Sequence, residues 1–555
     1  MSISLPLGID DFAKVREEHY YYIDKTAFIK QLLNTRFEAN LVTRPRRFGK
    51  SLTMSMLEDF FDISRDSKAH FDGLKISEET ELCERWMNRW PVVALTMKSV
   101  DGLNFQDAYG MLEVVIANLC KKYAFLGDSS KVNPADKELF NKLMYQAANK
   151  QNLKNSLVLI TRMMSAHYGK KVILIMDEYD VPVAKASEHG YYDEMLDMIR
   201  SLLGDAIKTN PHLKFAVVTG CLRISKESIF TGVNNFVTDA ITGDRFNEHV
   251  GFTPVEVRQL LLDVGFIDHM DEVKEWYDGY RFGSVEVYCP WAVLSYASAL
   301  QRDPGAKPKK YWGNTSGNDI IYKYISRKLR NVKSSLNSLM DDGILVTQIE
   351  EDLTYDYLKS SAKNFWSLLY LTGYLTNANP ADLKGEVPDT YAALRIPNKE
   401  VREVFKSNII DWFNSYIVKI DRTDICNAIW NGNLDTAQKL LSALLLKTVS
   451  YHDYQESFYH AFLAGLFAGD EYDVESNNEY GVGRPDVVVK DDDNQRALVI
   501  EVKYAKTESE IPGKFAEARK QFADERYLEG IPDDYTTVTG YCAVFCAKKC
   551  FMKIV

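Results

Sequence analysis

Residues 484–503 have the sequence RPDVVVKDDDNQRALVIEVK, and this stretch decides the fold expected for the C-terminal part of the chain. Two runs rich in valine and isoleucine, 484–489 and 497–503, flank the polar residues 491–494. Short β-branched runs on either side of a polar turn are typical of two adjacent strands. The stretch therefore predicts a β-hairpin.

Charged side chains lie along one face of this expected hairpin. Side chains two positions apart on a strand point the same way, so Glu501 and Lys503 share a face, while Ile500 and Val502 point into the core. Asp486 on the neighbouring strand comes within reach of Glu501. Two carboxylates at that distance repel unless a cation lies between them, and hard oxygen ligands suit Mg²⁺ or Mn²⁺.

These three side chains predict a metal-dependent catalytic site. Asp486 and Glu501 are the expected metal ligands. A metal held there activates a water molecule and stabilises charge on a phosphate, while Lys503 orients that water or neutralises the transition state. The alternatives are an exposed hairpin with solvated charges and a domain of this fold that has lost its activity.

Two helices are expected beside the hairpin in the sequence. Residues 454–466 form an amphipathic pattern in which Glu456 lies off the apolar face, so Glu456 could be a further metal ligand or could orient one. Residues 515–527 form a second helical pattern that offers Gln521 toward the hairpin. We therefore add Glu456 and Gln521 to the expected catalytic residues.

A strand, a loop and a helix follow one another near the N-terminus. The extended run 38–43 leads into RPRRFGKS at 44–51, and a helical pattern follows. In a P-loop, backbone amides and the helix N-terminus surround the phosphates, the lysine reaches the outer phosphates, and the Ser or Thr hydroxyl coordinates magnesium. The match is partial, because Arg44 stands where the first glycine belongs. The expected nucleotide-binding residues of this loop are Arg46, Arg47, Gly49, Lys50 and Ser51, with Ser51 also a magnesium ligand.

Two further apolar runs end in polar residues that suit a nucleotide site. The run 172–176 suits the centre of a parallel sheet and ends in Asp177-Glu178, where Asp177 could hold magnesium and Glu178 could orient a water for attack on the terminal phosphate. The run 215–220 contains Thr219, and Arg223 follows it; the Thr219 hydroxyl could sense the terminal phosphate. The alternatives are a core strand that ends in acidic residues, and capping or surface roles for Thr219 and Arg223.

These runs and a fourth at 92–97 alternate with helical stretches, which predicts an α/β domain with an open parallel sheet. From 253 onward the pattern is mostly helical. Helix 365–371, strand 374–376, strand 391–396 and a helix capped by Asn398 outline a winged helix. Such a unit either binds DNA or transmits nucleotide state, and fold analogy alone supplies no site.

Length, charge and cysteine use limit the class of protein. A chain of 555 residues is too long for one ordinary core and predicts a modular protein. The N-terminus has no secretory pattern, no run approaches the roughly 20 apolar residues of a membrane span, and the cysteines lack CxxC pairs, so we expect a cytoplasmic protein. A net charge of −11 disfavours polyanions in general, so any nucleic-acid contact must be local.

Taken together, these features resemble the AAA-ATPase-like proteins that carry a C-terminal PD-(D/E)xK nuclease domain, a family widespread in anaerobic and gut bacteria. The resemblance is carried by residues 22–26, 43–52, 175–180, 219–220 with Arg223, 234–236 and 276–283, and in the C-terminal part by Glu456, Pro485-Asp486, Glu501-Val502-Lys503, Gln521 and Tyr527. In this family an arginine-rich loop replaces the glycine-rich start of the P-loop, and Arg44 looks like this family trait. The resemblance implies ATP binding and leaves ATP hydrolysis open.

The expected architecture is α/β, with three parts. These are a P-loop ATPase-like parallel-sheet domain at 1–250, a helical lid and winged-helix-like region at 251–430, and an α/β restriction-endonuclease-like domain at 431–555. We expect an ATP-regulated nuclease that uses ATP and Mg²⁺ (or Mn²⁺), acts on nucleic acid with DNA favoured over RNA, contacts no membrane and could form a homo-oligomer. The alternative function is a nucleotide-dependent switch or interaction protein whose nuclease fold is catalytically silent.

Overall fold

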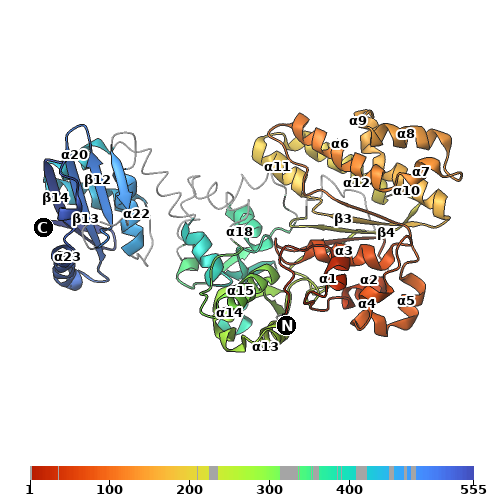
Figure 1. Ribbon diagram of the computed structural model, residues 1–555, viewed down its shortest axis with the longest axis horizontal. Coiled ribbons are helices and arrows are strands. Elements are labelled where there is room, and N and C mark those ends of the chain that lie inside the picture. Colours follow the sequence, from red (N-terminus) through yellow and green to blue (C-terminus); the bar gives the residue numbers. More distant parts are fainter. Residues whose placement is uncertain are drawn as a thin grey trace. The chain divides into compact units, whose positions relative to one another are not determined.

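The computed structural model describes most of the chain in two compact units. The described residues are 3–35, 37–208, 210–223, 236–312, 335–336, 338–351, 353, 362–383, 385–388, 390–407, 422–448, 456–467, 472–476 and 483–555. Unit 1 comprises Met1–Asn314 and Ile344–Val401, and unit 2 comprises Thr315–Gly343 and Arg402–Val555. Each unit has its own principal sheet, in agreement with the predicted α/β class (Figure 1). The three-part division stays a prediction.

The sheet of unit 1 has five parallel strands in the order β2-β3-β4-β1-β5. The strands are β1 (Ala39–Thr43), β2 (Val92–Thr96), β3 (Val172–Asp177), β4 (Leu213–Gly220) and β5 (Phe236–Asp239). Their side chains are mostly apolar and buried, as expected for a parallel sheet covered on both faces. The predicted parallel sheet is therefore confirmed.

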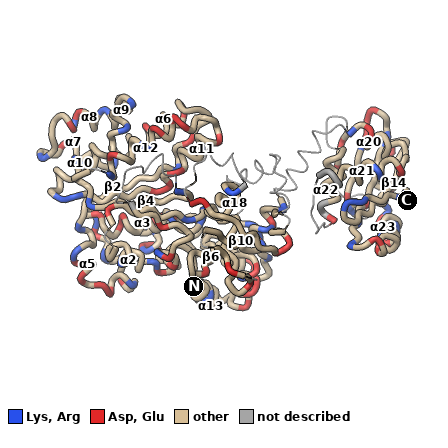
Figure 2. Tube along the Cα trace, turned by 180° about the vertical axis from the view of Figure 1, so that it is seen from behind, with Lys and Arg blue, Asp and Glu red and all other residues tan. Residues whose placement is uncertain are grey.

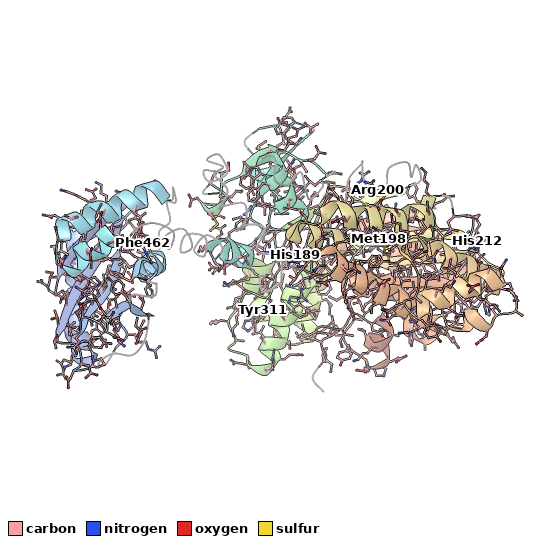
Figure 3. The ribbon with its side chains drawn as sticks, turned by 90° about the horizontal axis from the view of Figure 1, so that it is seen from above. His189, Met198, Arg200, His212, Tyr311 and Phe462 are labelled. Carbon is pink, nitrogen blue, oxygen red and sulfur yellow. The ribbon has the colours of Figure 1, made fainter. Side chains whose placement is uncertain are left out.

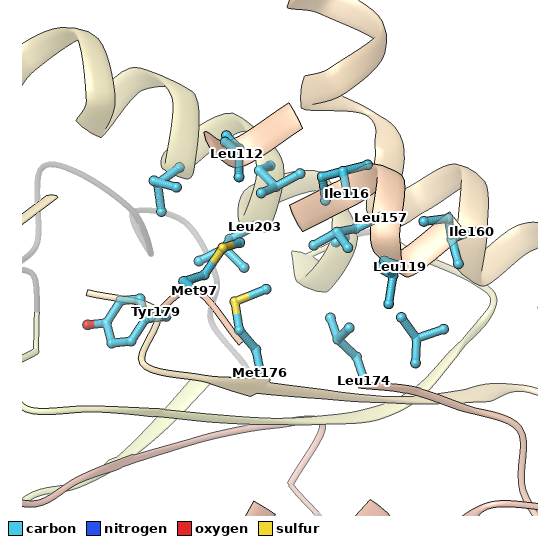
Figure 4. Packing of buried hydrophobic residues seen from close by; sticks show 14 of the residues in the cluster. Met97, Leu112, Ile116, Leu119, Leu157, Ile160, Leu174, Met176, Tyr179 and Leu203 are labelled. Atoms are coloured by element: carbon cyan, nitrogen blue, oxygen red, sulfur yellow. The ribbon is translucent and has the colours of Figure 1, made fainter. Parts of the chain in front are cut away.

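Helices cover both faces of this sheet (Figure 1). One face carries α1 (Phe12–Glu17), α2 (Ala27–Thr35), α3 (Lys50–Phe61), α4 (Lys68–Phe71) and α5 (Thr80–Trp86). The other carries α6 (Phe105–Lys122), α7 (Phe125–Asp128), α8 (Pro134–Met144), α9 (Lys150–Lys154), α10 (Ser156–Tyr168), α11 (Val181–His189) and α12 (Tyr192–Lys208). On that second face, Leu174 and Met176 of β3 pack against Leu112, Ile116 and Leu157 of the helices in a continuous core (Figure 4).

The rest of unit 1 is helical with two small sheets. It contains α13 (Pro254–Asp263), α14 (Met270–Tyr277), the hairpin β6 (Tyr280–Phe282) and β7 (Val285–Val287), α15 (Pro290–Arg302), β8 (Leu345–Gln348), α18 (Ala362–Leu371), β9 (Thr376–Asn377) and β10 (Tyr391–Arg395). Strands β8, β10 and β9 form an antiparallel sheet in that order. The helix, strand and strand predicted here are present, and Asn398 accepts a hydrogen bond from the Val401 amide (3.0 Å) at the start of a helix that continues to 407.

The structure differs from that prediction in two details. The strand expected at 374–376 begins only at Thr376, because the amides of Tyr374 and Leu375 both donate to the Leu369 carbonyl (2.8 and 3.0 Å) and close the end of α18. Strand β8 was not predicted, since its pairing with β10 depends on residues more than forty positions away.

Unit 2 contains a mixed five-stranded sheet in the order β11-β12-β13-β14-β15, in which β13 and β14 are parallel and the other pairs antiparallel. The strands are β11 (Asp473–Ser476), β12 (Val487–Asp491), β13 (Arg496–Tyr504), β14 (Thr537–Cys546) and β15 (Lys549–Ile554). The helices are α20 (Thr423–Trp430), α21 (Leu434–Thr448), α22 (Glu456–Phe467) and α23 (Ile511–Glu525).

The hairpin predicted at 484–503 is β12 and β13, and its two flanking helices are α22 and α23. Helix α23 begins four residues before the predicted start, with Pro512 in its first turn, where a missing amide costs nothing. It ends before Tyr527, because Arg526 adopts the left-handed conformation (φ 53°). The predicted start of the first helix, residues 454–455, lies outside the described residues. No helix in the described part of the chain is long and apolar enough to cross a membrane.

Candidate functional site

The hairpin of unit 2 brings Asp486 and Glu501 to opposite positions. Val487 pairs with Ile500, so residue 486 continues the antiparallel ladder opposite residue 501. The Asp486 carboxylate is fixed across the hairpin, since its Oδ2 accepts a hydrogen bond from the Val502 amide (2.8 Å). The two carboxylates of the predicted metal site therefore occupy opposite positions of the hairpin, where the charge of Asp486 acts on Glu501.

Glu501 and Lys503 are buried, with only 1% and 4% of each residue exposed. Both faces of β13 are covered. Ala497, Val499 and Ala505, which alternate with Glu501 and Lys503 along one face, pack in a core with α23. On the opposite face the Tyr504 ring stacks on Tyr459 of α22, with ring centroids 5.8 Å apart. The alternative of solvated charges on an exposed hairpin was therefore wrong.

Burial makes the charge state of Glu501 unusual. Its Oε1 accepts a hydrogen bond from Lys503 Nζ (2.7 Å), while its Oε2 is buried without a hydrogen-bond partner among the described residues. Burial, and then the charge of Asp486, raise the pKa of Glu501 to about 7, although Lys503 opposes the shift. Burial by itself would lower the pKa of Lys503, but its hydrogen bond to Glu501 and the nearby carboxylates outweigh burial and raise it.

Glu456 and Gln521 approach the hairpin from different helices. Glu456, in the first turn of α22, lies 3.5 Å from Lys503 Nζ through Oε1 and accepts from the Tyr504 amide (3.4 Å) through Oε2. Gln521 on α23 donates to the Tyr527 hydroxyl (2.9 Å), which donates to the Arg484 carbonyl (3.4 Å) two residues before Asp486. Glu456 thus contacts Lys503 directly, whereas Gln521 acts on the segment that carries Asp486 through Tyr527.

The donor set fits a hard divalent cation. Asp486 and Glu501 supply carboxylate oxygens, and the unpartnered Glu501 Oε2 is a buried acceptor that a cation would satisfy. Within the described residues there is no ready cluster of three or more His, Cys, Asp or Glu side chains. The remaining ligands would therefore be water or substrate oxygens, as is usual for Mg²⁺.

In unit 1 the loop between β1 and α3 has the curvature of a phosphate-binding loop. Gly49 adopts φ 91° immediately before α3, a conformation that favours glycine, and Arg47 is also left-handed (φ 71°). Lys50 is buried and its Nζ donates to the carbonyl oxygens of Arg44 (3.0 Å) and Pro45 (2.9 Å). The ammonium group thus lies inside the loop, at the first turn of a helix, where phosphates are favoured.

Asp177 connects three segments at the carboxyl edge of the sheet. Its two carboxylate oxygens accept hydrogen bonds from the hydroxyls of Ser51 and Thr219, each at 2.5 Å. Because β1, β3 and β4 are parallel neighbours, their carboxyl ends meet at the same edge. Ser51 and Asp177, the two residues predicted to hold magnesium at this loop, are therefore in direct contact, and Asp177 also contacts Thr219.

The other predicted nucleotide-site residues lie around this centre. Glu178 is half-buried and left-handed (φ 53°); burial, then Asp177, raise its pKa, while Lys50 and Arg46 lower it. Arg47 is exposed, with its guanidinium 4.4 Å from the centroid of the Trp291 ring. Arg223 is half-buried at the end of a described segment, and residues 234–235, part of the family-like phrases, lie outside the described residues.

Arg44, which stands in place of the first glycine of the motif, is fully buried. Its guanidinium donates to the carbonyl oxygens of Thr43 (2.8 Å), Asp239 (2.7 Å) and Arg245 (2.9 Å) and to Asn247 Oδ1 (3.0 Å). Burial lowers its pKa to about 10, so it stays charged at neutral pH. No local pattern indicated that this arginine anchors the loop to residues 239–247, which follow it by about 200 positions.

Asp180 and Gly220 are further site residues that sequence reasoning missed. Asp180 is buried; its Oδ2 accepts from the amides of Cys221 (2.9 Å) and Leu222 (3.0 Å), and its Oδ1 has no partner among the described residues. A Cβ on Gly220 would lie 2.6 Å from Asp180 Oδ1 and 2.7 Å from the Tyr179 ring. Asp180 and Gly220 therefore hold the ends of β3 and β4 together beside Asp177.

The phosphate-binding loop also packs on the helical part of unit 1. Trp312 Nε1 donates to the Arg46 carbonyl (3.2 Å), and the Trp312 amide donates to the buried Glu400 carboxylate (2.6 Å). The Phe48 ring lies 5.0 Å from the Tyr280 ring, between centroids. Residues of the predicted lid region thus contact the backbone of the loop itself.

Comparisons with known proteins match both ends of the chain. Residues 6–230 match the family model described as Predicted AAA-ATPase, and residues 454–554 match the model described as PD-(D/E)XK nuclease superfamily. A protein of Azotobacter chroococcum mcd 1, described as an uncharacterized protein in the vnfD 5′ region, is 27% identical over 402 residues, which cover 72% of this chain and 68% of that protein. The predicted order of the two parts is confirmed.

Proposed function

We propose that this chain, which joins an AAA-ATPase-like segment to a segment of the PD-(D/E)XK nuclease superfamily, is an ATP-regulated, metal-dependent nuclease. The supporting observation is the pairing of the half-buried Asp486 with the buried Glu501, in which Glu501 Oε2 has no partner among the described residues and Lys503 lies alongside. A fold that needed these residues only for packing would gain by replacing them with apolar side chains, because burying charge is costly.

The two carboxylates and the lysine of this site have different chemical tasks. Asp486 and Glu501 would hold the metal, which when bound supplies a Lewis acid and lowers the pKa of a coordinated water. The Val502 amide fixes the direction of the Asp486 carboxylate. Lys503, held by Glu501 and Glu456, presents a buried ammonium group that can donate to a water or to a phosphate oxygen as negative charge develops there.

The segment that carries Asp486 is positioned from α23. Gln521 and Tyr527 form a short hydrogen-bonded chain to the Arg484 carbonyl. This chain fixes the backbone two residues before the carboxylate. We therefore assign Gln521 a positioning role, since its hydrogen bond reaches the hairpin through Tyr527.

The loop of unit 1 would bind MgATP. Lys50 would exchange its carbonyl partners for phosphate oxygens, and Ser51 with Asp177 would hold Mg²⁺. Glu178, whose pKa is raised, could accept a proton from the attacking water. The contact between Trp312 and the Arg46 carbonyl gives the helical part of unit 1 a direct link to the occupied loop.

The nuclease assignment is tested with single- and double-stranded DNA and RNA, with Mg²⁺ or Mn²⁺, and with and without ATP. Asp486→Asn should lower the cleavage rate by about 100-fold or more, since one missing electrostatic group of a catalytic site costs that much. Asp493→Asn, an exposed carboxylate in the turn of the same hairpin, is the matched control and should cleave normally. The proposal fails if the wild-type chain cuts none of these substrates under any of these conditions.

The nucleotide assignment is tested by binding of a fluorescent ATP analogue. Lys50→Ala should abolish binding, and Glu178→Gln should retain binding but slow hydrolysis. Lys68→Ala, an exposed lysine of unit 1 outside the loop, is the control. Equal binding by wild type and Lys50→Ala would remove the P-loop assignment.

The second candidate is a nucleotide-dependent switch with a silent nuclease fold. The net charge of −11 favours it, because an acidic chain attracts polyanions poorly. Under this alternative, ATP would bind at Lys50 while wild type and Asp486→Asn would be equally inert toward nucleic acid.

A further inference from the structure

Five basic side chains gather at the amino-terminal edge of the unit 1 sheet. Lys170 and Lys171 immediately precede β3, Lys214 is the second residue of β4, and Arg85 and Arg89 lie at the end of α5 and just before β2. Because the strands are parallel, their amino ends meet at the edge opposite the phosphate-binding loop. We name these five residues the basic cluster; Figure 2 shows Lys and Arg positions at this end of the sheet beside β2.

The position of the cluster separates it from the nucleotide site. His189 ends α11, and α11 follows β3 shortly after Asp177. His212 immediately precedes β4. Figure 3 shows these two histidines on opposite sides of Met198 and Arg200 of α12. A ligand at the basic cluster would therefore not compete with a nucleotide at Lys50.

Two tryptophans support the cluster. The Trp86 and Trp90 rings stack with centroids 5.1 Å apart. Lys214 Nζ lies 5.4 and 4.9 Å from their centroids, the Arg85 guanidinium 5.8 Å from that of Trp86, and Lys170 Nζ 5.9 Å from that of Trp90. Aromatic faces hold cations in place without neutralising them.

In the described part of the chain, none of the five side chains forms an ion pair with a carboxylate, and Lys170 donates to the Arg89 carbonyl (3.1 Å). Glu81 and Glu84 on α5 are exposed and make no ion pair with the cluster. Burial, together with the charges of Arg85 and Lys171, lowers the pKa of Lys214. In a chain of net charge −11, five adjacent cations form a local positive field.

We propose that the basic cluster binds the phosphodiester backbone of nucleic acid. The reason is charge complementarity: Arg85, Arg89, Lys170 and Lys171 are exposed, and cations on a surface bind successive phosphates without reading bases. Trp86 is buried and Trp90 half-buried, and both rings are stacked on each other, so the indoles serve as supports for the cations and the binding is independent of sequence. That the bound strand is also the substrate of unit 2 rests on the proposed function.

Such a surface would explain how an acidic chain acts on a polyanion. The overall charge repels nucleic acid, whereas a confined positive area captures it. A cluster that instead received an acidic protein surface would bind a polypeptide of glutamate as well as it binds DNA. The binding experiment includes that polymer for this reason.

The test is fluorescence anisotropy of labelled DNA with the full chain in EDTA, so that no cleavage occurs. Arg89→Ala/Lys171→Ala/Lys214→Ala removes three cations of the cluster. Lys68→Ala/Lys121→Ala/Arg258→Ala removes three exposed cations elsewhere in unit 1 and is the matched control for net charge. Since Lys214 packs on the indoles, Arg89→Ala/Lys171→Ala is a second variant that changes exposed side chains only.

The expected result is a loss specific to the cluster. Each phosphate contact contributes about 0.9 to the slope of log affinity against log salt on duplex DNA, so the triple variant should lose up to about 3 from this slope and at least about tenfold in affinity. The control should keep the wild-type slope. Equal binding by both triple variants, or no binding by wild type, overturns the proposal, as does preference for polyglutamate over DNA.

Cleavage assays separate this proposal from the nuclease proposal. If wild type binds DNA through the cluster but never cuts it, the cluster stands and the nuclease assignment falls. If the cluster variant cuts with unchanged KM, the nuclease assignment stands, and the cluster is overturned as the surface that holds the substrate. Loss of cleavage only at low DNA concentration, seen as a raised KM with normal kcat, supports both.

Discussion

Binding of Mn²⁺ by unit 2 should depend on pH in the range where Glu501 titrates. A cation at Asp486 and Glu501 requires both carboxylates to be ionised. With the pKa of Glu501 at about 7, the group is protonated in about nine-tenths of molecules at pH 6 and in about one-tenth at pH 8. The dissociation constant should therefore rise about tenfold between pH 8 and pH 6, and each bound ion should release a proton at the lower pH.

The assay is a titration of the nucleotide-free chain with Mn²⁺, in which electron paramagnetic resonance measures the free ion. Glu501→Gln removes an anionic ligand and should weaken binding at every pH. Asp493→Asn should reproduce the wild-type curve. A wild-type dissociation constant that stays level from pH 6 to pH 8, while Glu501→Gln still weakens binding, would refute the burial argument for Glu501.

The same pKa gives a stability prediction with a definite sign. Because the folded state holds the Glu501 proton more tightly than the unfolded state, this group favours folding at low pH, and that advantage is lost as pH rises from about 4.5 through about 7. The ionised carboxylate then costs about 3 kcal/mol at pH 8. The melting temperature of Glu501→Gln minus that of wild type should therefore be larger at pH 8 than at pH 5.

Three further predictions concern the nucleotide site of unit 1 and its surroundings. Arg44→Gly restores the usual glycine of the motif but leaves buried carbonyl groups without their hydrogen-bond donor, which costs about 1–3 kcal/mol for each group. The variant should therefore have a lower melting temperature and bind ATP more weakly. A variant as stable as wild type would contradict the anchoring role. Gly220→Ala should destabilise the fold by about 1–3 kcal/mol, because the added Cβ clashes with Asp180. Gly204→Ala in α12 is the control, since a Cβ there meets nothing within 4 Å, and thermal melts compare the two variants. Trp312→Phe should remove most of the change in tryptophan fluorescence on ATP binding, while Trp276→Phe should retain it; a full signal in Trp312→Phe would show that the loop is not sensed there.

Strands β1, β2, β3 and β4 and the hairpin of β12 and β13 were predictable because local pattern determines them. The runs at 172–176 and 215–220 are apolar on both faces, which only a covered strand tolerates, and they became β3 and β4. Strand β8 escaped prediction, since Val346 is exposed and its pairing is set by β10 rather than by its own residues. The order of the strands likewise depends on tertiary contacts that no local pattern records.

The candidate catalytic face was predicted, but its surroundings were not. Two-residue periodicity put Glu501 and Lys503 together and the structure agrees, with 2.7 Å between Nζ and Oε1. Their burial follows from Ala497, Val499 and Ala505 on the same face, a sign that was present in the sequence and was overlooked. The chain from Gln521 through Tyr527 to the hairpin depends on where α23 ends, which Arg526 decides by its backbone conformation.

The anchoring of Arg44 limits how this protein can be divided for study. A fragment that stopped at residue 230, where the match to the ATPase family model ends, would keep the loop but lose Asp239, Arg245 and Asn247. It would carry a buried cation with most of its acceptors removed, and β1 would lose its neighbour β5. Weak nucleotide binding by such a fragment would then describe the truncation, so shortened versions of unit 1 need to extend at least past Asn247.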